Sequence, residues 1–236
     1  MAGDAGGERR FPGVRVLVGT YEADGELVEP LLPAGVEPWD DPVRCAVWGL
    51  DFPFPGPPYR LAAVAVRVRF ADELHHFFPV AYCSRSEEPE AGLVGAAGPR
   101  RRADIGMSAA AGQRILTVGG ADGGRLITVT ATPDRPASVD EFAGPPLLQV
   151  RGDPDIPHRG PAGPYRLVRT DLVIDGTALE AGPGLVTVDT FSELDPLLAL
   201  EPVRMRDCFW GTVELRSARE RTVHRATGGG QRPRPR

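Results

Sequence analysis

Three consecutive arginines are the residues of this chain whose type and spacing best suit ligand chemistry. Arg100, Arg101 and Arg102 follow a Gly-Pro pair. A guanidinium presents a planar fork of donors that binds a carboxylate or a phosphate through two hydrogen bonds. The same run is also typical of a solvated loop that binds nothing. Two interpretations therefore stay open at this point, an anion clamp and an exposed loop.

The adjacent histidines His75 and His76 suggest a metal site, because Asp72 and Glu73 lie next to them. Neighbouring residues of an extended segment point to opposite faces, so the two imidazoles cannot readily share one ion. No G-x-S-x-G elbow supports a serine hydrolase triad. We therefore expect neither a metal nor another cofactor.

The absence of lysine excludes more enzyme classes than any motif adds. All 27 basic residues are arginine. Without a side-chain amine, the chain cannot form a lysine Schiff base or anchor pyridoxal phosphate, and it lacks the lysine of P-loop proteins and of kinases.

Charge and cysteine usage indicate a soluble cytoplasmic protein. The net charge is −5, and an acidic body is a poor nucleic-acid surface, although seven arginines and two acids fall in residues 214–236. Cys45, Cys83 and Cys208 form no C-x-x-C pair, so neither a disulfide framework nor a zinc ribbon is indicated. The N-terminal residues lack the apolar stretch of a secretory signal, and no apolar run reaches the length of a membrane span. We expect no nucleic-acid or membrane partner.

Glycine and proline supply 29 and 25 residues, which favours many short strands over long helices. In the segment 61–70, valines alternate with alanine and arginine, as in a half-buried strand. The glycine run at 119–124 predicts a hairpin turn rather than a phosphate loop, because strand patterns flank it on both sides. The predicted strands are 14–21, 43–50, 61–70, 77–83, 114–118, 125–131, 165–175, 185–190 and 203–215, with short helices near 25–32, 89–97 and 195–200. We predict a mainly β, antiparallel domain over residues 11–225, with flexible ends at 1–10 and 226–236.

Several segments, in their order and spacing, resemble the acetoacetate decarboxylase superfamily. They are Val18–Asp24, Leu31–Pro38, Pro57–Arg60, Gly92 with Pro99–Arg101, and Asp195–Val203. The resemblance implies a cone-shaped β-barrel with an enclosed cavity, and a homo-oligomer. It also implies an active site in which the first lysine of a Pro-Lys-Lys motif forms a Schiff base with a β-keto acid.

The chain departs from that motif at every position that matters for the chemistry. Arg100 and Arg101 match the two lysines, Leu61 and Ala46 match two pocket glutamates, and Val14 matches a pocket arginine. A guanidinium stays protonated up to a pH of about 12 and does not condense with ketones. We therefore expect no Schiff base.

The resemblance and the departures together predict a repurposed enzyme of specialised metabolism. It would act as a cyclase, dehydratase or lyase on a hydrophobic keto acid or polyketide-like molecule. Arg100 would be the catalytic anchor, and the substrate-binding residues would be Arg101, Val14, Ala46, Leu61 and Tyr59. Tyr59, Tyr82 and His75 are candidates for moving a proton. The alternative is a non-catalytic binding or scaffold protein that retains the fold.

Overall fold

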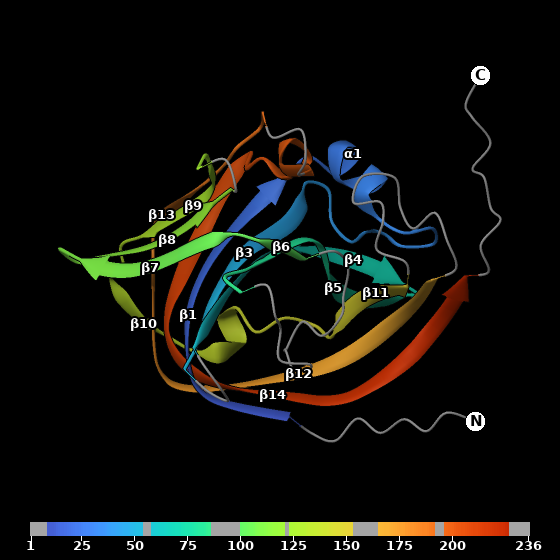
Figure 1. Ribbon diagram of the computed structural model, residues 1–236. Helices are drawn as coiled ribbons and strands as arrows, with labels where there is room; N and C mark the ends of the chain where they lie inside the picture. Colours follow the sequence, from blue (N-terminus) through green and yellow to red (C-terminus); the bar gives the residue numbers. More distant parts are fainter. Residues whose placement is uncertain are drawn as a thin grey trace.

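A computed structural model describes residues 9–53, 58–85, 100–120, 123–152, 165–191 and 196–226. Strands dominate these residues, and they form one sheet of ten strands and one of four (Figure 1). The predicted helix at 89–97 lies outside the described residues, as do the distal parts of the predicted flexible ends. β1 begins at Arg9 and β14 ends at Ala226, slightly outside the bounds 11–225 that the sequence suggests for the domain.

The large sheet follows the order β2-β4-β3-β1-β14-β12-β11-β5-β6, with β10 paired to β12. Its strands are β1 (Arg9–Ala23), β2 (Glu37–Pro38), β3 (Val43–Phe52), β4 (Tyr59–Phe70), β5 (Glu73–Cys83), β6 (Arg100–Arg102), β10 (Arg135–Ala137), β11 (Leu147–Gly152), β12 (Tyr165–Gly182) and β14 (Arg204–Ala226). Their pairs are antiparallel except β5–β11 and β5–β6.

The large sheet curves strongly back on itself, because β4 also pairs with β5. On its other side, β5 joins the sheet through β11, and these two strands pair at only two residue pairs. The predicted mainly β, antiparallel fold is confirmed, and its large sheet is strongly curved without forming a regular closed barrel. The curve still encloses a concave face, and the η2 turn (Val139–Glu141) lies inside it (Figure 1).

The small sheet has the order β13-β9-β8-β7 and covers part of the convex face. Its strands are β7 (Asp104–Ala110), β8 (Gln113–Gly119), β9 (Arg125–Ala131) and β13 (Gly184–Val188). β8 and β9 pair antiparallel around the glycine run, which confirms the predicted hairpin. The remaining elements are the helix α1 (Gly25–Val28) and the turns η1 (Glu29–Leu31) and η3 (Pro196–Leu200).

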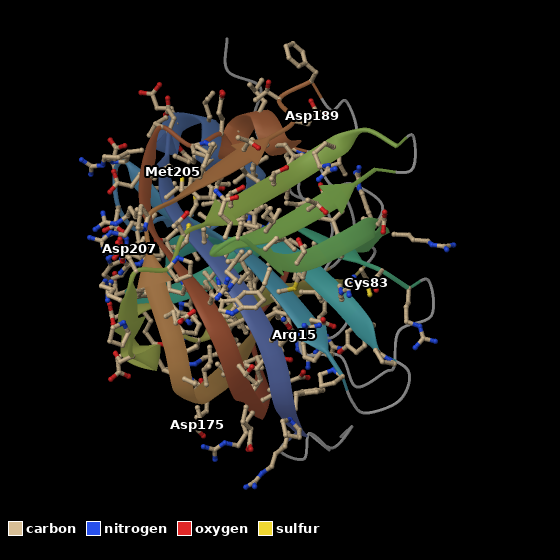
Figure 2. All side chains as sticks on the ribbon, turned by 90° about the vertical axis from the view of Figure 1, so that its left-hand side faces the viewer. Arg15, Cys83, Asp175, Asp189, Met205 and Asp207 are labelled. Carbon is tan, nitrogen blue, oxygen red and sulfur yellow. The ribbon has the colours of Figure 1, made fainter. Side chains whose placement is uncertain are left out.

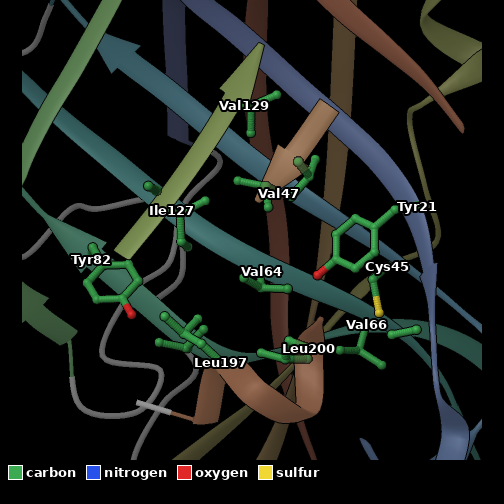
Figure 3. Close-up of a cluster of buried hydrophobic side chains, with 14 of the residues drawn as sticks. Tyr21, Cys45, Val47, Val64, Val66, Tyr82, Ile127, Val129, Leu197 and Leu200 are labelled. Atoms are coloured by element: carbon green, nitrogen blue, oxygen red, sulfur yellow. The ribbon is translucent and has the colours of Figure 1, made fainter. Parts of the chain in front are cut away.

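Buried side chains divide into two clusters, one on each face of the large sheet. The outer cluster joins the convex face to the small sheet, and Figure 3 shows Ile127 and Val129 of β9 facing Val47 and Val64. The inner cluster lies on the concave face and includes Phe142, just after η2. Because of these two clusters, β4 is buried on both faces from Leu61 to Val66, so its predicted half-burial is wrong.

The small sheet lies so close to the large sheet that one position of β1 has room only for glycine. A Cβ built on Gly19 of β1 would lie 2.7 Å from Val186 Cγ2 and 2.8 Å from Val129 Cγ1. The small sheet therefore rests directly on the backbone of β1. No helix in the described ranges is long and apolar enough to cross a bilayer.

Candidate functional site

A cavity of about 1050 Å³ opens at one end of the concave face. Strands β1, β3, β4, β5 and β14 form its walls, and the segment Glu141–Pro145 after β10 closes one side. Met205 and Asp207 of β14 mark its position, at the margin of the molecule away from Arg15 and Asp175 (Figure 2). Its volume suits a ligand of drug-like size.

Four arginines lie around the cavity mouth, and they share two carboxylates. Arg204 and Arg206 each place a guanidinium nitrogen 2.5 Å from a carboxylate oxygen of Glu22. Arg67 Nη1 and Arg44 Nε lie 3.4 and 3.7 Å from Asp40 Oδ2. Since each guanidinium carries five N–H donors, many donors remain free to bind an anion.

The charges at the cavity mouth contribute to the shifted pKa values of Arg67 and Glu22. Burial, together with the nearby Arg44 and Arg206 charges, lowers the pKa of Arg67, against the effect of Asp40. Hydrogen bonds from Arg204 and then Arg206 lower the pKa of Glu22, so this carboxylate stays ionised at neutral pH.

Two acidic residues also line the cavity, Glu141 and Asp207, and both are paired with Arg135. Arg135 lies 2.8 Å from the Glu141 carboxylate and 2.7 Å from that of Asp207. The Glu141 side chain also accepts a hydrogen bond from the Ser138 backbone, completing a capping box at η2. Arg135 thereby ties the η2 segment to β14 across the cavity wall.

Behind the charged mouth, the cavity becomes apolar. Ala46, Phe142 and Phe209 line it, and all three are buried. The ring of Phe142 packs against Phe209 and Trp48, with centroids 5.4 and 5.9 Å away. The cavity therefore presents an aromatic floor beneath a cationic entrance.

His76 lines the same cavity from β5 and is 8% exposed. Burial, with a smaller effect of the Arg67 charge, lowers its pKa to about 4. The imidazole is therefore neutral near pH 7.

The predicted site residues are brought together only in part. Val14, Ala46, Tyr59 and Leu61 all belong to the inner cluster, but of these four only Ala46 is among the described cavity-lining residues. The other three are buried within 3% exposure, deeper on the concave face.

Arg100 and Arg101 lie on β6, which the sequence does not predict as a strand. The register pairs Arg100 with Ala81 of the inner cluster, and Arg101 with Tyr82 of the outer cluster. The two positions therefore belong to opposite faces of the sheet. The side chain of Arg100 lies outside the described part of the structure.

The histidines are placed on opposite faces, as predicted. His75 pairs with Val68 of the outer cluster, whereas His76 pairs with Arg67 at the cavity. Within the described ranges, no three His, Cys, Asp or Glu side chains lie close enough to hold a metal. Cys45, Cys83 and Cys208 are buried free thiols.

The local sequence does not indicate that the mouth arginines and His76 line one cavity. They come from β3, β4, β5 and β14, far apart in the sequence. The one local signal is a charged residue at the end of an otherwise apolar strand face, as with Arg67 after Ala63 and Ala65.

Comparison with known proteins identifies the fold. No curated protein matches the chain. The acetoacetate decarboxylase from Legionella pneumophila subsp. pneumophila str. Philadelphia 1 is similar in structure, with a TM-score of 0.77 at 17% identity, covering 94% of this chain and 88% of that one. The enduracididine biosynthesis enzyme MppR, solved with HEPES buffer bound, gives 0.74 at 17% identity over 89% and 86% of the two chains.

An acetoacetate decarboxylase-like enzyme from Sphingomonas wittichii RW1 is also similar, with a TM-score of 0.71 at 14% identity, covering 89% of this chain and 91% of the other. These likenesses establish the fold. The family model for acetoacetate decarboxylase matches residues 3–226, nearly the whole chain. The chain therefore belongs to the acetoacetate decarboxylase family.

Proposed function

We propose that this protein is a repurposed member of its family that converts a hydrophobic keto acid or polyketide-like carboxylate without forming a Schiff base. The observation that carries the proposal is the cavity, in which an arginine-rich mouth stands over an aromatic floor. Such a cavity suits a molecule with a carboxylate at one end and an apolar body.

The charged end of the substrate would bind at Arg44, Arg67 and Arg206. These three guanidiniums lie close enough for two of them to lower the pKa of the third. An anion placed among them relieves their mutual repulsion and accepts charge-assisted hydrogen bonds. The apolar body would then extend towards Phe142 and Phe209.

Chemistry without a Schiff base follows from the residues at the family's lysine positions. The chain has no lysine, and the resemblance matches Arg100 and Arg101 to those positions. A guanidinium cannot supply the neutral amine that attacks a ketone, but it can stabilise an enolate or a carboxylate. Cyclisation, dehydration and lyase reactions can all proceed through an enolate.

Arg100 is proposed as a second, deeper anchor. Trp48, Ala63, Ala81 and Arg100 are register partners across four strands. Trp48 is two residues along β3 from Ala46, so this row lies about 7 Å deeper than the cavity wall at Ala46. Arg100 stands three strand spacings from Trp48, roughly 14 Å across the sheet, so only a substrate long enough to extend beyond the cavity lining would reach it.

A structural neighbour supports keto-acid chemistry in specialised metabolism on this fold. MppR has been solved with pyruvate, and with the condensation product of pyruvate and imidazole 4-carboxaldehyde. At 17–18% identity, these complexes support the proposal by analogy of fold.

The proposal is tested by binding and turnover of keto acids. We expect 4-methyl-2-oxopentanoate to bind, as measured by calorimetry, and its carboxylate-free analogue 4-methyl-2-pentanone to bind at least tenfold more weakly. Arg67→Leu should weaken binding of the acid about tenfold, which corresponds to about 1.4 kcal/mol. Arg125→Leu, at an exposed position on β9, is the matched control and should bind like the wild type.

Turnover is followed by mass spectrometry of the protein incubated with a panel of longer keto acids, with and without borohydride. New products without a borohydride-trapped adduct are the expected result. A trapped adduct on a side chain would contradict the proposal. Binding without any product would favour the alternative, a non-catalytic binding or scaffold protein.

A further inference from the structure

His76 is held in the cavity wall by contacts on three sides. Its backbone N–H donates a hydrogen bond of 2.9 Å to the carbonyl of Pro146. Its ring meets the Trp48 ring edge-on, with centroids 6.2 Å apart. Arg67 is its register partner on β4, so the two side chains are neighbours on the concave face.

The segment that closes the cavity lies directly against the His76 ring. A Cβ built on Gly144 would lie 2.0 Å from His76 Cε1 and 2.6 Å from Nδ1. Only a residue without a side chain can approach the imidazole in this way. Gly144 therefore fixes the position of the ring relative to the cavity.

The two ring nitrogens of His76 take no part in the hydrogen bonding of the described fold. Neither ring nitrogen of His76 forms a hydrogen bond with any residue that the structure describes. They are not among the buried side-chain atoms that lack a partner, so they are open to the cavity, where water or a ligand can bind them.

The other proton-transfer candidates are placed less well. His75 lies on the opposite face, where its Nδ1 is 3.1 Å from the carbonyl of Glu73. Tyr82 belongs to the outer cluster, and Tyr59 lies in the inner cluster but is not among the cavity-lining residues described.

The structure assigns to His76 the proton transfer at the carbon next to the substrate's keto group, with Arg67 balancing the charge that forms on the oxygen. This inference rests on the proposed function of the same cavity. The C–H bond breaks and its proton moves to an imidazole nitrogen. The electron pair forms a carbon–carbon double bond, and the carbonyl oxygen becomes an enolate. The reverse step returns a proton to carbon, so no oxidant or co-reactant is needed.

The electrostatics agree with this role. Burial and the Arg67 charge keep the pKa of the free His76 ring low, so the ring is unprotonated near pH 7 and a nitrogen lone pair is available. A carboxylate bound beside Arg67 would offset that positive charge and remove the smaller of the two effects that lower the pKa, which makes the imidazole a stronger base. Arg44, Glu141, Arg206 and Asp207 also face the cavity and contribute to the field there.

Exchange of deuterium into 4-methyl-2-oxopentanoate tests the assignment without knowledge of the natural substrate. The keto acid is incubated in D₂O with the full chain, and loss of the C3 proton signal is followed by NMR and corrected for the buffer rate. We expect the wild type to accelerate exchange. His76→Gln should lose at least a hundredfold of this acceleration while binding the probe within threefold of the wild type.

Two further variants separate a chemical role from a structural one. His75→Gln removes a neighbouring imidazole that lies outside the cavity, and should exchange at the wild-type rate. Gly144→Ala must displace the His76 ring, and should slow exchange more than it weakens probe binding. The wild-type rate should also rise with pH to a plateau, and the His76→Gln rate should not.

The outcomes distinguish this inference from the proposed function. If the wild type exchanges the probe and His76→Gln does so equally fast, the assignment to His76 is overturned while the proposed function stands. If the probe binds and the wild type does not exchange it, proton transfer at this site is overturned. If the probe does not bind, the proposed function fails and the inference with it.

Discussion

The buried imidazole of His76 predicts that the folded protein loses stability as the pH falls from 7 to 5. Its pKa is about 4 in the folded chain, against about 6.5 in an unfolded chain. Between these values, the unfolded chain binds a proton that the folded chain does not. Stability therefore falls as the pH falls through this window.

The size of the effect follows from the two pKa values. Each unit of difference is worth about 1.4 kcal/mol, so the full effect is about 3 kcal/mol. At pH 5, one and a half units below the unfolded value, the loss is about 2 kcal/mol. Other groups titrate in the same range, so the measurement must isolate His76.

Urea unfolding of the wild type and of His76→Gln at pH 7 and pH 5 isolates the contribution. We expect the wild type to lose about 2 kcal/mol more than the variant between the two pH values. His224→Gln, at an exposed position, is the matched control and should follow the wild type. Equal losses in the wild type and His76→Gln would refute the argument, because they would mean that the folded ring takes up its proton as readily as the unfolded one.

Two other predictions test the packing and the mouth of the cavity. Gly19→Ala should destabilise the protein by about 1–3 kcal/mol, because its methyl group would overlap two stiff, buried valines of the small sheet. Gly119→Ala, whose nearest contacts are 3.7 Å away, should change the free energy of unfolding by less than about 0.5 kcal/mol; similar effects of both substitutions would contradict this packing. Glu22→Gln should tighten binding of 4-methyl-2-oxopentanoate about two- to fivefold at low salt, because Arg204 and Arg206 lose their shared anion. Calorimetry should show this gain shrinking as salt is added, and Glu180→Gln, which faces Arg114 instead, should leave the affinity unchanged.

Local patterns in the sequence were sufficient for most of the strands. Alternation and β-branched residues predict the cores of β1, β3, β4 and β5, and the glycine run predicts the β8–β9 hairpin. The strands of the large sheet extend beyond their predicted ends, as β12 and β14 do most clearly. A strand ends where its hydrogen-bonded pairing with the neighbouring strand ends, and a local sequence pattern does not show that pairing.

The short strands β6, β7 and β11 were missed for the same reason. β6 consists of three arginines, which no strand propensity favours, and it is a strand because it pairs with β5. The burial of β4 on both faces likewise depends on elements far away in the chain: the small sheet on one side and the inner cluster on the other.

The amino-acid sequence by itself determined what chemistry is available. The chain has arginine without lysine, four histidines and three separate cysteines, and these counts hold whatever the fold. Only the tertiary structure decided where a ligand would meet that chemistry. It brings Arg44, Arg67, Arg206 and His76 from four strands to one cavity, whereas Val14 and Leu61 are packed among apolar neighbours. The physical reason is that strand register and sheet curvature, which depend on contacts across the whole chain, set which side chains share the concave face and which of these remain open to a ligand.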